Sequence, residues 1–277
     1  MTLIELMIGI AIGLMAVATA LGALIIARNL AGTTNEASTL QQQATYITRL
    51  LGTQLRQAGA LQMSLKFNAP DTEIPTAFDK VAFLTGSSTE PSIQGGESTT
   101  TPPTEELTAR YRNYEESLIK SLGTTPGTVI TEMRKPFIDC TGASSTDMVS
   151  NAFSFKKDTD GKISTLYCTG ASGKQPVASN VINFSTRYIY QSSTLTGAPK
   201  YQTLTGAQVD TQPGATARDR WASVIAANVC LILSGTEYID TDGGKYTDCN
   251  GEEKLMGNRL VIVYKNTYQI RSQGAPA

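Results

Sequence analysis

The chain opens with a long apolar run. Residues 6–27 are 22 consecutive positions without a charged side chain. As a helix this run would be about 33 Å long, which matches a bilayer hydrocarbon core of about 30 Å. A cleavable signal peptide would carry Lys or Arg before a shorter apolar run, and residues 1–5 contain neither. The pattern therefore predicts one membrane span that belongs to the working protein.

After the apolar run the pattern becomes amphipathic without a helix breaker. Gln54 and other polar residues are expected on the outer faces, and Gly59 is a typical stop signal. We expect one helix over about residues 1–58, with residues 1–27 as the anchor and residues 28–58 packed on a sheet. A coiled coil with another subunit is the alternative. The apolar stripe that predicts this helix consists of Leu30, Ala37, Leu40, Ala44, Ile47, Leu51, Leu55 and Ala58.

Residues 59–277 are expected to form one α+β head built on an antiparallel sheet. Alternation of apolar and polar residues predicts a face formed by Ile182, Phe184, Thr186, Tyr188 and Tyr190. The predicted strands over residues 151–157 and 162–168 flank an Asp-Thr-Asp-Gly sequence, which is typical of a hairpin. The predicted strands cover residues 151–157, 162–168, 181–190, 223–233 and 259–270.

Other parts of the head give weaker patterns. Residues 86–104 and 192–212 are rich in Gly, Ser, Thr and Gln, which predicts two long loops. Residues 105–123 keep an apolar spacing that favours a helix, and a strand over the sequence ELTARYR is the alternative.

Composition and charge exclude several classes of function. The 277 residues carry 23 basic and 24 acidic side chains, so a net charge of -1 makes nucleic acid an improbable partner. The absence of His excludes Ser-His-Asp and Cys-His catalysis and the usual imidazole metal sites. We therefore expect a protein that is not an enzyme and that binds no cofactor.

The four cysteines, Cys140, Cys168, Cys230 and Cys249, have neither CxxC spacing nor His partners. An even number in a head that follows a membrane span favours disulfides in an oxidising compartment. Of the three possible connectivities we expect Cys140 with Cys168 and Cys230 with Cys249. Four buried free thiols are the alternative.

Two features suggest a site and have a plainer explanation. Carboxylates gather at Asp158 and Asp160 and again at Asp240, Asp242 and Asp248, which would suit calcium. Neither group has EF-hand spacing, so tight turns are the favoured interpretation. The single Trp221 and the Tyr-rich strand could line a groove, but core packing is the commoner role.

The N-terminal sequence MTLIELMIGIAIGLM resembles the mature N-terminus of type IV pilin-like proteins, usually FTLIELMIxxxIxG. The resemblance implies cleavage and N-terminal methylation by a prepilin peptidase, and a helix that is first a membrane anchor and then the filament core. It also implies that Glu5 meets the Met1 amine of a neighbouring subunit, with Met1 here in place of Phe. Glu5 could also close a capping box with Thr2, and the two roles are compatible. The family's flexible helix zone would involve Gly9, Gly13 and Gly22. The alternative is that these glycines are ordinary in a membrane helix and that Gly9 and Gly13 only permit close helix packing.

A second resemblance lies in residues 221–233, which are similar to the C-terminal region of PilW-type minor pilins. That family also tends to have two cysteine pairs. It implies the type IV pilin fold and a structural subunit that helps to initiate pilus assembly near the tip. The implied partners are other minor pilins, the major pilin, a PilY-type tip adhesin and the inner-membrane assembly platform.

The same resemblance places the chain in the inner membrane, with a periplasmic head, before assembly and in the extracellular pilus afterwards. By the same resemblance the filament would serve motility, adhesion or DNA uptake. One alternative function is a type II secretion minor pseudopilin of the GspJ kind, which tends to have a shorter head. A membrane-tethered periplasmic binding module or enzyme is the other.

Overall fold

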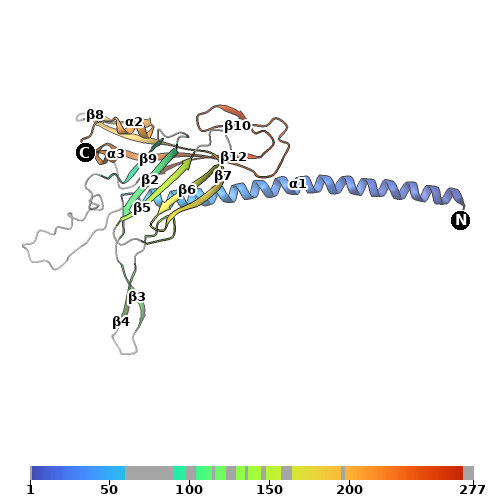
Figure 1. Ribbon diagram of the computed structural model, residues 1–277, viewed down its shortest axis with the longest axis horizontal. Helices are drawn as coiled ribbons and strands as arrows, with labels where there is room; N and C mark the ends of the chain where they lie inside the picture. The colour runs from blue at the N-terminus through green and yellow to red at the C-terminus, as the bar shows by residue number, and fades with distance from the viewer. Residues whose placement is uncertain are drawn as a thin grey trace, which may run out of the picture.

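The computed structural model describes residues 2–59, 90–97, 104–113, 116–122, 129–134, 137–144, 148–156, 164–194 and 197–270. It consists of one long N-terminal helix that enters a head containing an antiparallel sheet (Figure 1). The α+β class expected from the sequence is thus confirmed.

Helix α1 (Leu3–Gln57) runs for 55 residues without a break, which confirms the expected single helix. Gly59 follows with a φ of 71°, a left-handed conformation that glycine adopts without strain, so the expected stop is also present. No side chain described between residues 3 and 35 is buried, and this half of α1 projects from the head (Figure 1). The buried stripe of the second half consists of Leu40, Ala44, Ile47, Leu51, Leu55 and Ala58.

Two residues of α1 differ from their expected environment. Leu30 belongs to the predicted stripe but is 68% exposed, because the head does not reach that turn of the helix. Gln54 is expected on an outer face but is buried beside the sheet. The helical period therefore predicts which face is apolar, whereas the extent of the head decides where burial begins.

An eight-stranded antiparallel sheet forms the centre of the described head, in the order β1-β2-β5-β6-β7-β9-β12, with β8 paired to β7. Two further ribbons, β3 with β4 and β10 with β11, lie outside this sheet. The strands of the large sheet are β1 (Ile93–Glu97), β2 (Thr104–Arg112), β5 (Met148–Lys156), β6 (Ser164–Gly170), β7 (Gly173–Thr194), β8 (Gly197–Leu204), β9 (Val224–Ser234) and β12 (Val261–Gln269). The ribbons are β3 (Glu116–Leu122) with β4 (Val129–Arg134), and β10 (Lys245–Thr247) with β11 (Glu253–Leu255).

Five of these strands, β5, β6, β7, β9 and β12, confirm the strands predicted from alternation, and β5 pairs with β6 as expected. The turn between them, with Asp158 and Asp160, lies outside the described residues. Strand β7 is longer than expected: it pairs with β6 in its first part and with β9 and β8 further on. Its register shifts between Val181 and Asn183, so Val181 rather than Ile182 joins the face of Phe184.

Three predictions for the head are wrong where residues are described. The expected helix over residues 105–123 is strand β2 followed by β3, because Leu107, Ala109 and Tyr111 are buried at every second position. The expected loop over residues 86–104 contains β1. Its glycines allow close packing, since a Cβ atom at Gly95 would overlap the Tyr188 hydroxyl.

The expected loop over residues 192–212 contains the end of β7, strand β8 and helix α2 (Gly206–Asp210). Strand β8 is polar because it is paired only to β7 and lies at an edge, where Pro is also tolerated. Helix α3 (Ala217–Ala222) follows and carries Trp221, which is fully buried. The Trp221 ring contacts Tyr188 edge to face at 4.7 Å between centroids, so its role is core packing rather than groove lining.

The core lies between α1 and one face of the sheet, and α2 and α3 add Val209 and Trp221 to it. On β9, Ala227, Val229 and Leu231 belong to this inner face. The alternate residues Cys230 and Ile232 belong to a smaller cluster on the outer face, under the β10–β11 ribbon. Strand alternation thus gives the sheet a helix-covered face and a partly open face.

Candidate functional site

The projecting half of α1 is the most unusual surface of the molecule. Its large apolar residues are exposed, among them Leu3 at 78%, Ile12 at 64% and Ile26 at 70%. By length and composition the helix is apolar enough to cross a membrane. A folded soluble chain rarely exposes a continuous apolar surface of this size, so this half of α1 is a candidate surface for contact with a bilayer or with other protein chains.

Glu5 is the only acidic residue of the first 27 residues. The Thr2 backbone N–H donates to Glu5 Oε2 at 2.9 Å, which is the carboxylate half of the capping arrangement expected from the sequence. A carboxylate accepts up to about four hydrogen bonds, so this contact leaves room for a second donor. Met1 lies outside the described residues.

Gly9, Gly13 and Gly22 lie inside the uninterrupted α1. A Cβ atom built on any of them would meet no atom within 4 Å, so no described contact of this chain requires glycine there. The expectation of a flexible helix zone concerns an assembled filament and stays a prediction.

Glu36 fastens α1 to the head at the point where the helix leaves it. Its carboxylate oxygen accepts hydrogen bonds from the backbone N–H groups of Thr236 and Glu237, in the segment after β9. Gly235 makes room for this contact, since a Cβ atom there would collide with the Glu36 carboxylate. Glu36 is only 8% exposed, so the bonds form away from bulk water.

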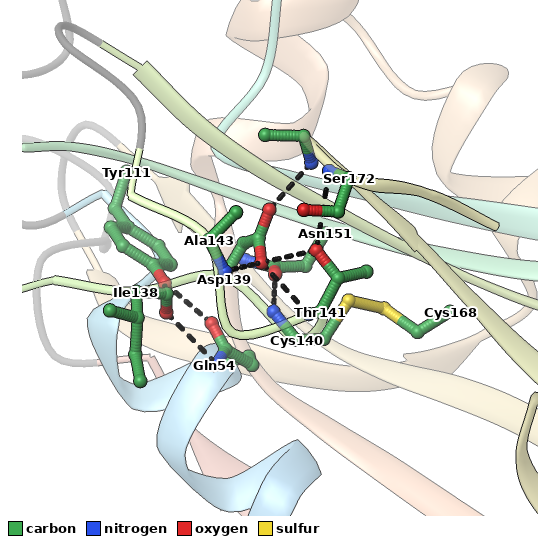
Figure 2. Close-up of a disulfide and its surroundings, with 11 residues drawn as sticks. Gln54, Tyr111, Ile138, Asp139, Cys140, Thr141, Ala143, Asn151, Cys168 and Ser172 are labelled. Carbon is green, nitrogen blue, oxygen red and sulfur yellow. Dashed lines mark hydrogen bonds between the residues drawn. A yellow bond between two sulfur atoms is a disulfide. The ribbon is translucent and has the colours of Figure 1, made fainter. Parts of the chain in front are cut away.

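A second polar contact holds the other end of α1 (Figure 2). The Tyr111 hydroxyl lies 2.5 Å from Gln54 Oε1 and 2.9 Å from the Ile138 carbonyl oxygen. Burial raises the pKa of Tyr111 to about 12, so the hydroxyl keeps its proton. Further along the sheet, the Tyr268 hydroxyl donates to the Thr48 carbonyl oxygen at 3.0 Å.

The disulfide between Cys140 and Cys168 lies beside these contacts, at a loop organised by Asp139 (Figure 2). Asp139 Oδ1 accepts from the Thr141 N–H at 2.8 Å and the Ala143 N–H at 2.9 Å, and Oδ2 accepts from the Ala171 N–H. Burial alone would raise the pKa of Asp139, but the hydrogen bond from the Thr141 hydroxyl at 2.6 Å and these backbone N–H bonds outweigh it and lower the pKa.

The second disulfide joins Cys230 of β9 to Cys249 between β10 and β11. Both bonds are the pairings expected from the sequence, and the described chain contains no free cysteine. Each bond ties a loop to the sheet, as small secreted or periplasmic domains commonly require.

The candidate calcium residues form turns. Asp240 Oδ1 accepts from the Asp242 N–H at 3.0 Å, and Asp248 Oδ1 accepts from the N–H groups of Asn250 and Glu252 at 2.8 and 2.9 Å. No group of three or more potential metal ligands gathers anywhere in the described residues. The hydrogen bonds of Asp240 and Asp248 therefore favour turn formation over metal binding.

Sequence reasoning missed Glu36, Asp139 and the Gln54–Tyr111 contact. For Glu36 there was a signal, because it lies one helical turn before Leu40 on the apolar stripe, where an acidic residue needs a partner. Asp139 carries no comparable signal, since its donors come from a loop whose shape depends on the rest of the fold.

Comparison of the chain with family models, with curated proteins and with solved structures finds no match.

Proposed function

We propose that the chain is a structural subunit of a type IV pilin-like filament, a minor pilin of the PilW type with a type IV pilin fold. The observation that carries the proposal is the division of α1. Its second half is built into the head, while its first half is apolar, exposed and continuous with the second. That layout, together with Glu5 at the start of the helix, is the one that the resemblance of the N-terminal sequence implies.

In this proposal residues 1–27 anchor the subunit in the inner membrane before assembly, with the head in the periplasm. The two disulfides suit that oxidising compartment. During assembly the same apolar surface leaves the lipid and packs against the helices of neighbouring subunits. The exchange replaces one apolar environment by another, so little apolar surface is exposed to water along the way.

The Glu5 carboxylate favours this transfer from the lipid into the filament. A carboxylate at membrane depth costs about 2.5 to 3.5 kcal/mol on insertion scales, so a cationic partner is favoured. An α-amine has a pKa near 8 and is cationic at neutral pH. We propose that the methylated Met1 amine of an adjacent subunit is that partner, after processing by a prepilin peptidase. Pairing with other minor pilins, the major pilin and a PilY-type adhesin would follow at the tip, guided by the assembly platform.

Two other functions share part of this layout. A GspJ-like pseudopilin of type II secretion would share the helix and Glu5. A membrane-tethered binding module would need only the anchor, and it gives no reason for Glu5 at the helix start or for a helix that continues into the head.

The first experiment is peptide mass spectrometry of filaments sheared from the cell surface. A methylated Met1 peptide in these filaments is the expected result. A methylated peptide confined to the membrane fraction would favour the pseudopilin, and an unprocessed N-terminus would return the chain to a plain anchor.

The Glu5→Gln variant tests the role of the carboxylate. It keeps the hydrogen-bond acceptor for Thr2 but loses the charge, so we expect normal amounts in the membrane and at least about a tenfold loss from sheared filaments, as removal of a buried ion-pair partner predicts. Glu106→Gln, on the exposed side of β2, is the matched control. Equal incorporation of wild type and Glu5→Gln would contradict the proposed pairing.

A further inference from the structure

The outer face of the sheet, on the side away from α1, carries an open recess of about 490 Å³. Its floor consists of two cross-strand rows on β7, β9 and β12. Antiparallel register places Arg187, Asn228 and Thr267 in one row, and Ser185, Cys230 and Lys265 in the other. These residues alternate with the buried inner-face residues of the same strands, so they share the outer face.

The recess has a defined wall. Cys249 lines it and is bonded to Cys230 of the floor, so the disulfide fixes the β10–β11 ribbon beside the rows. The Lys265 ammonium donates to the Asp248 carbonyl oxygen at 2.9 Å, which holds the lysine against the same wall. The Asp248 carboxylate is turned away to the backbone N–H groups of Asn250 and Glu252.

The recess carries two cationic side chains, Arg187 and Lys265. Neither lies within ion-pair distance of a carboxylate of any described residue, although the Arg187 charge acts on Glu105 and opposes the rise that burial causes in the pKa of that carboxyl. Adjacent strands are about 4.8 Å apart and each residue rises about 3.4 Å, so the two Cα atoms lie roughly 12 Å apart on a diagonal across β9. Both side chains are long enough to reach a group bound above the centre of the floor.

Hydrogen-bonding groups surround the same point. The Thr267 hydroxyl donates to Asn228 Oδ1 at 2.7 Å, which orients the Asn228 amide and leaves its nitrogen as a donor. The Ser185 hydroxyl lies in the row of Lys265. The Arg187 guanidinium, the Lys265 ammonium, the Asn228 amide nitrogen and the Ser185 hydroxyl are donors from which carboxylate and phosphate groups accept hydrogen bonds.

Arg187 also borders a second recess, which Glu97 and Glu105 line. The Glu105 carboxylate is occupied there, since it accepts from the Thr186 N–H at 3.0 Å and the Thr186 hydroxyl at 2.6 Å. Lys265 lines only the first of the two recesses, so it is the cleaner residue for a test.

We propose that this recess is a binding site for an oxyanion, a carboxylate or phosphate group, on a small ligand with neighbouring hydroxyl groups. Lys265 and Arg187 provide the charge, and Asn228, Ser185 and Thr267 provide orientation. The volume falls within the range of about 300 to 1,000 Å³ that is usual for small-ligand sites. None of the lining residues belongs to α1, so the proposal does not rest on the role of that helix.

The test is isothermal titration calorimetry of the full chain in an uncharged detergent at low ionic strength. The probes are inorganic phosphate and glucuronate, with glucose as the neutral counterpart of glucuronate. We expect saturable binding of at least one of the two anions, no binding of glucose, and weaker binding at higher salt. Binding of phosphate alone would identify a phosphate ligand, and binding of glucuronate alone an acidic sugar.

Lys265→Met and Thr267→Val are the test variants, and Lys200→Met on the exposed edge strand β8 is the matched control. We expect Lys265→Met to weaken binding about tenfold or more, because a hydrogen bond to a charged group is lost. Thr267→Val keeps the side-chain shape and should weaken it less. Lack of saturable anion binding by the wild type, equal binding of glucose and glucuronate, or equal losses in Lys265→Met and Lys200→Met would overturn the proposal.

Discussion

The two halves of α1 have the same backbone and opposite surroundings. Among residues 3–35 no described side chain is buried, although most of these residues are apolar. Residues 36–57 bury one stripe against the sheet and fasten it with polar contacts at Glu36, Thr48 and Gln54. The second half is therefore stabilised by the head, whereas the first half needs an environment that the head does not supply.

Because of this difference, substitutions in the two halves of α1 should affect different properties, folding in one case and assembly in the other. If the head alone stabilises the second half, a substitution there changes the free energy of unfolding of the head. A substitution in the first half should leave that free energy unchanged and alter only membrane insertion or assembly. Trp221 is the single tryptophan and is fully buried in the head, so its fluorescence reports head unfolding alone.

The strongest test of the comparison is Leu51→Ala. Leu51 is 1% exposed in the centre of the buried stripe, and truncation of such a residue leaves a cavity. We expect the free energy of unfolding to fall by about 2 to 5 kcal/mol, measured by guanidinium denaturation of the full chain in a nonionic detergent.

Leu14→Ala is the control for that measurement. Leu14 is 65% exposed in the first half, so the same truncation should change head unfolding by no more than about 0.5 kcal/mol. Similar losses in the two variants would mean that the halves are not independent.

The division of α1 is largely predictable from the sequence, and the reason is periodicity. Leu40, Ala44, Ile47, Leu51 and Leu55 follow the helical period, so the amino-acid order alone identifies the buried face. The place where burial begins is not predictable in this way, because it depends on how far the sheet extends. In residues 105–123 periodicity does not identify the element. The apolar residues of β2 fit both the helical period and the strand period, and the segment is a strand because it pairs with β1 and β5.

The polar contacts are less predictable than the apolar stripe. Two hydrophobic surfaces need only the right period, whereas Asp139 or Glu36 needs particular backbone N–H groups at about 3 Å. Those donors come from residues 32 and 200 positions away in sequence. The disulfides are accessible to sequence reasoning because four cysteines allow only three pairings.

The next largest effect is expected from the disulfide between Cys230 and Cys249, which lies entirely in the head. The two cysteines are 19 positions apart, and in the chain-entropy model a loop of this size contributes about 3 kcal/mol. The double Cys230→Ser, Cys249→Ser variant should lose about that much in the same denaturation assay. Its membrane insertion should equal that of the wild type; a loss of insertion would show that the head and the anchor are coupled.

Glu36 and Gly235 test the boundary between the two halves. Glu36→Ala leaves the N–H groups of Thr236 and Glu237 without their acceptor, and should cost about 1 to 3 kcal/mol. Gly235→Ala should also destabilise the head, because its Cβ would displace the same carboxylate. The double variant should lose less than the sum of the single losses. Fully additive losses would show that Gly235 acts through something other than Glu36.

The smallest effect is expected from Glu105→Gln, which asks whether the head has its own pH response. Burial raises the pKa of Glu105, although hydrogen bonds from Thr186 oppose the shift. A carboxyl with a raised folded-state pKa contributes stability below its unfolded pKa of about 4.3, and this contribution is lost as the pH rises through the folded pKa. The glutamine keeps an acceptor for Thr186 and carries no charge. It should therefore stabilise the head at pH 7, relative to wild type, by up to about 1 kcal/mol, and less or not at all at pH 4.

Glu106→Gln is the control for this prediction, because Glu106 follows directly on β2 and is exposed. Its denaturation midpoint should track the wild type at both pH values. If Glu105→Gln destabilises the head more at pH 7 than at pH 4, the charged carboxylate gains more from Thr186 than it loses by burial, and the pKa of Glu105 must be lowered instead. That result would make the Glu105 contact resemble that of Asp139, where hydrogen bonds outweigh burial, and would show that Glu105 and Asp139 are both held in their charged forms.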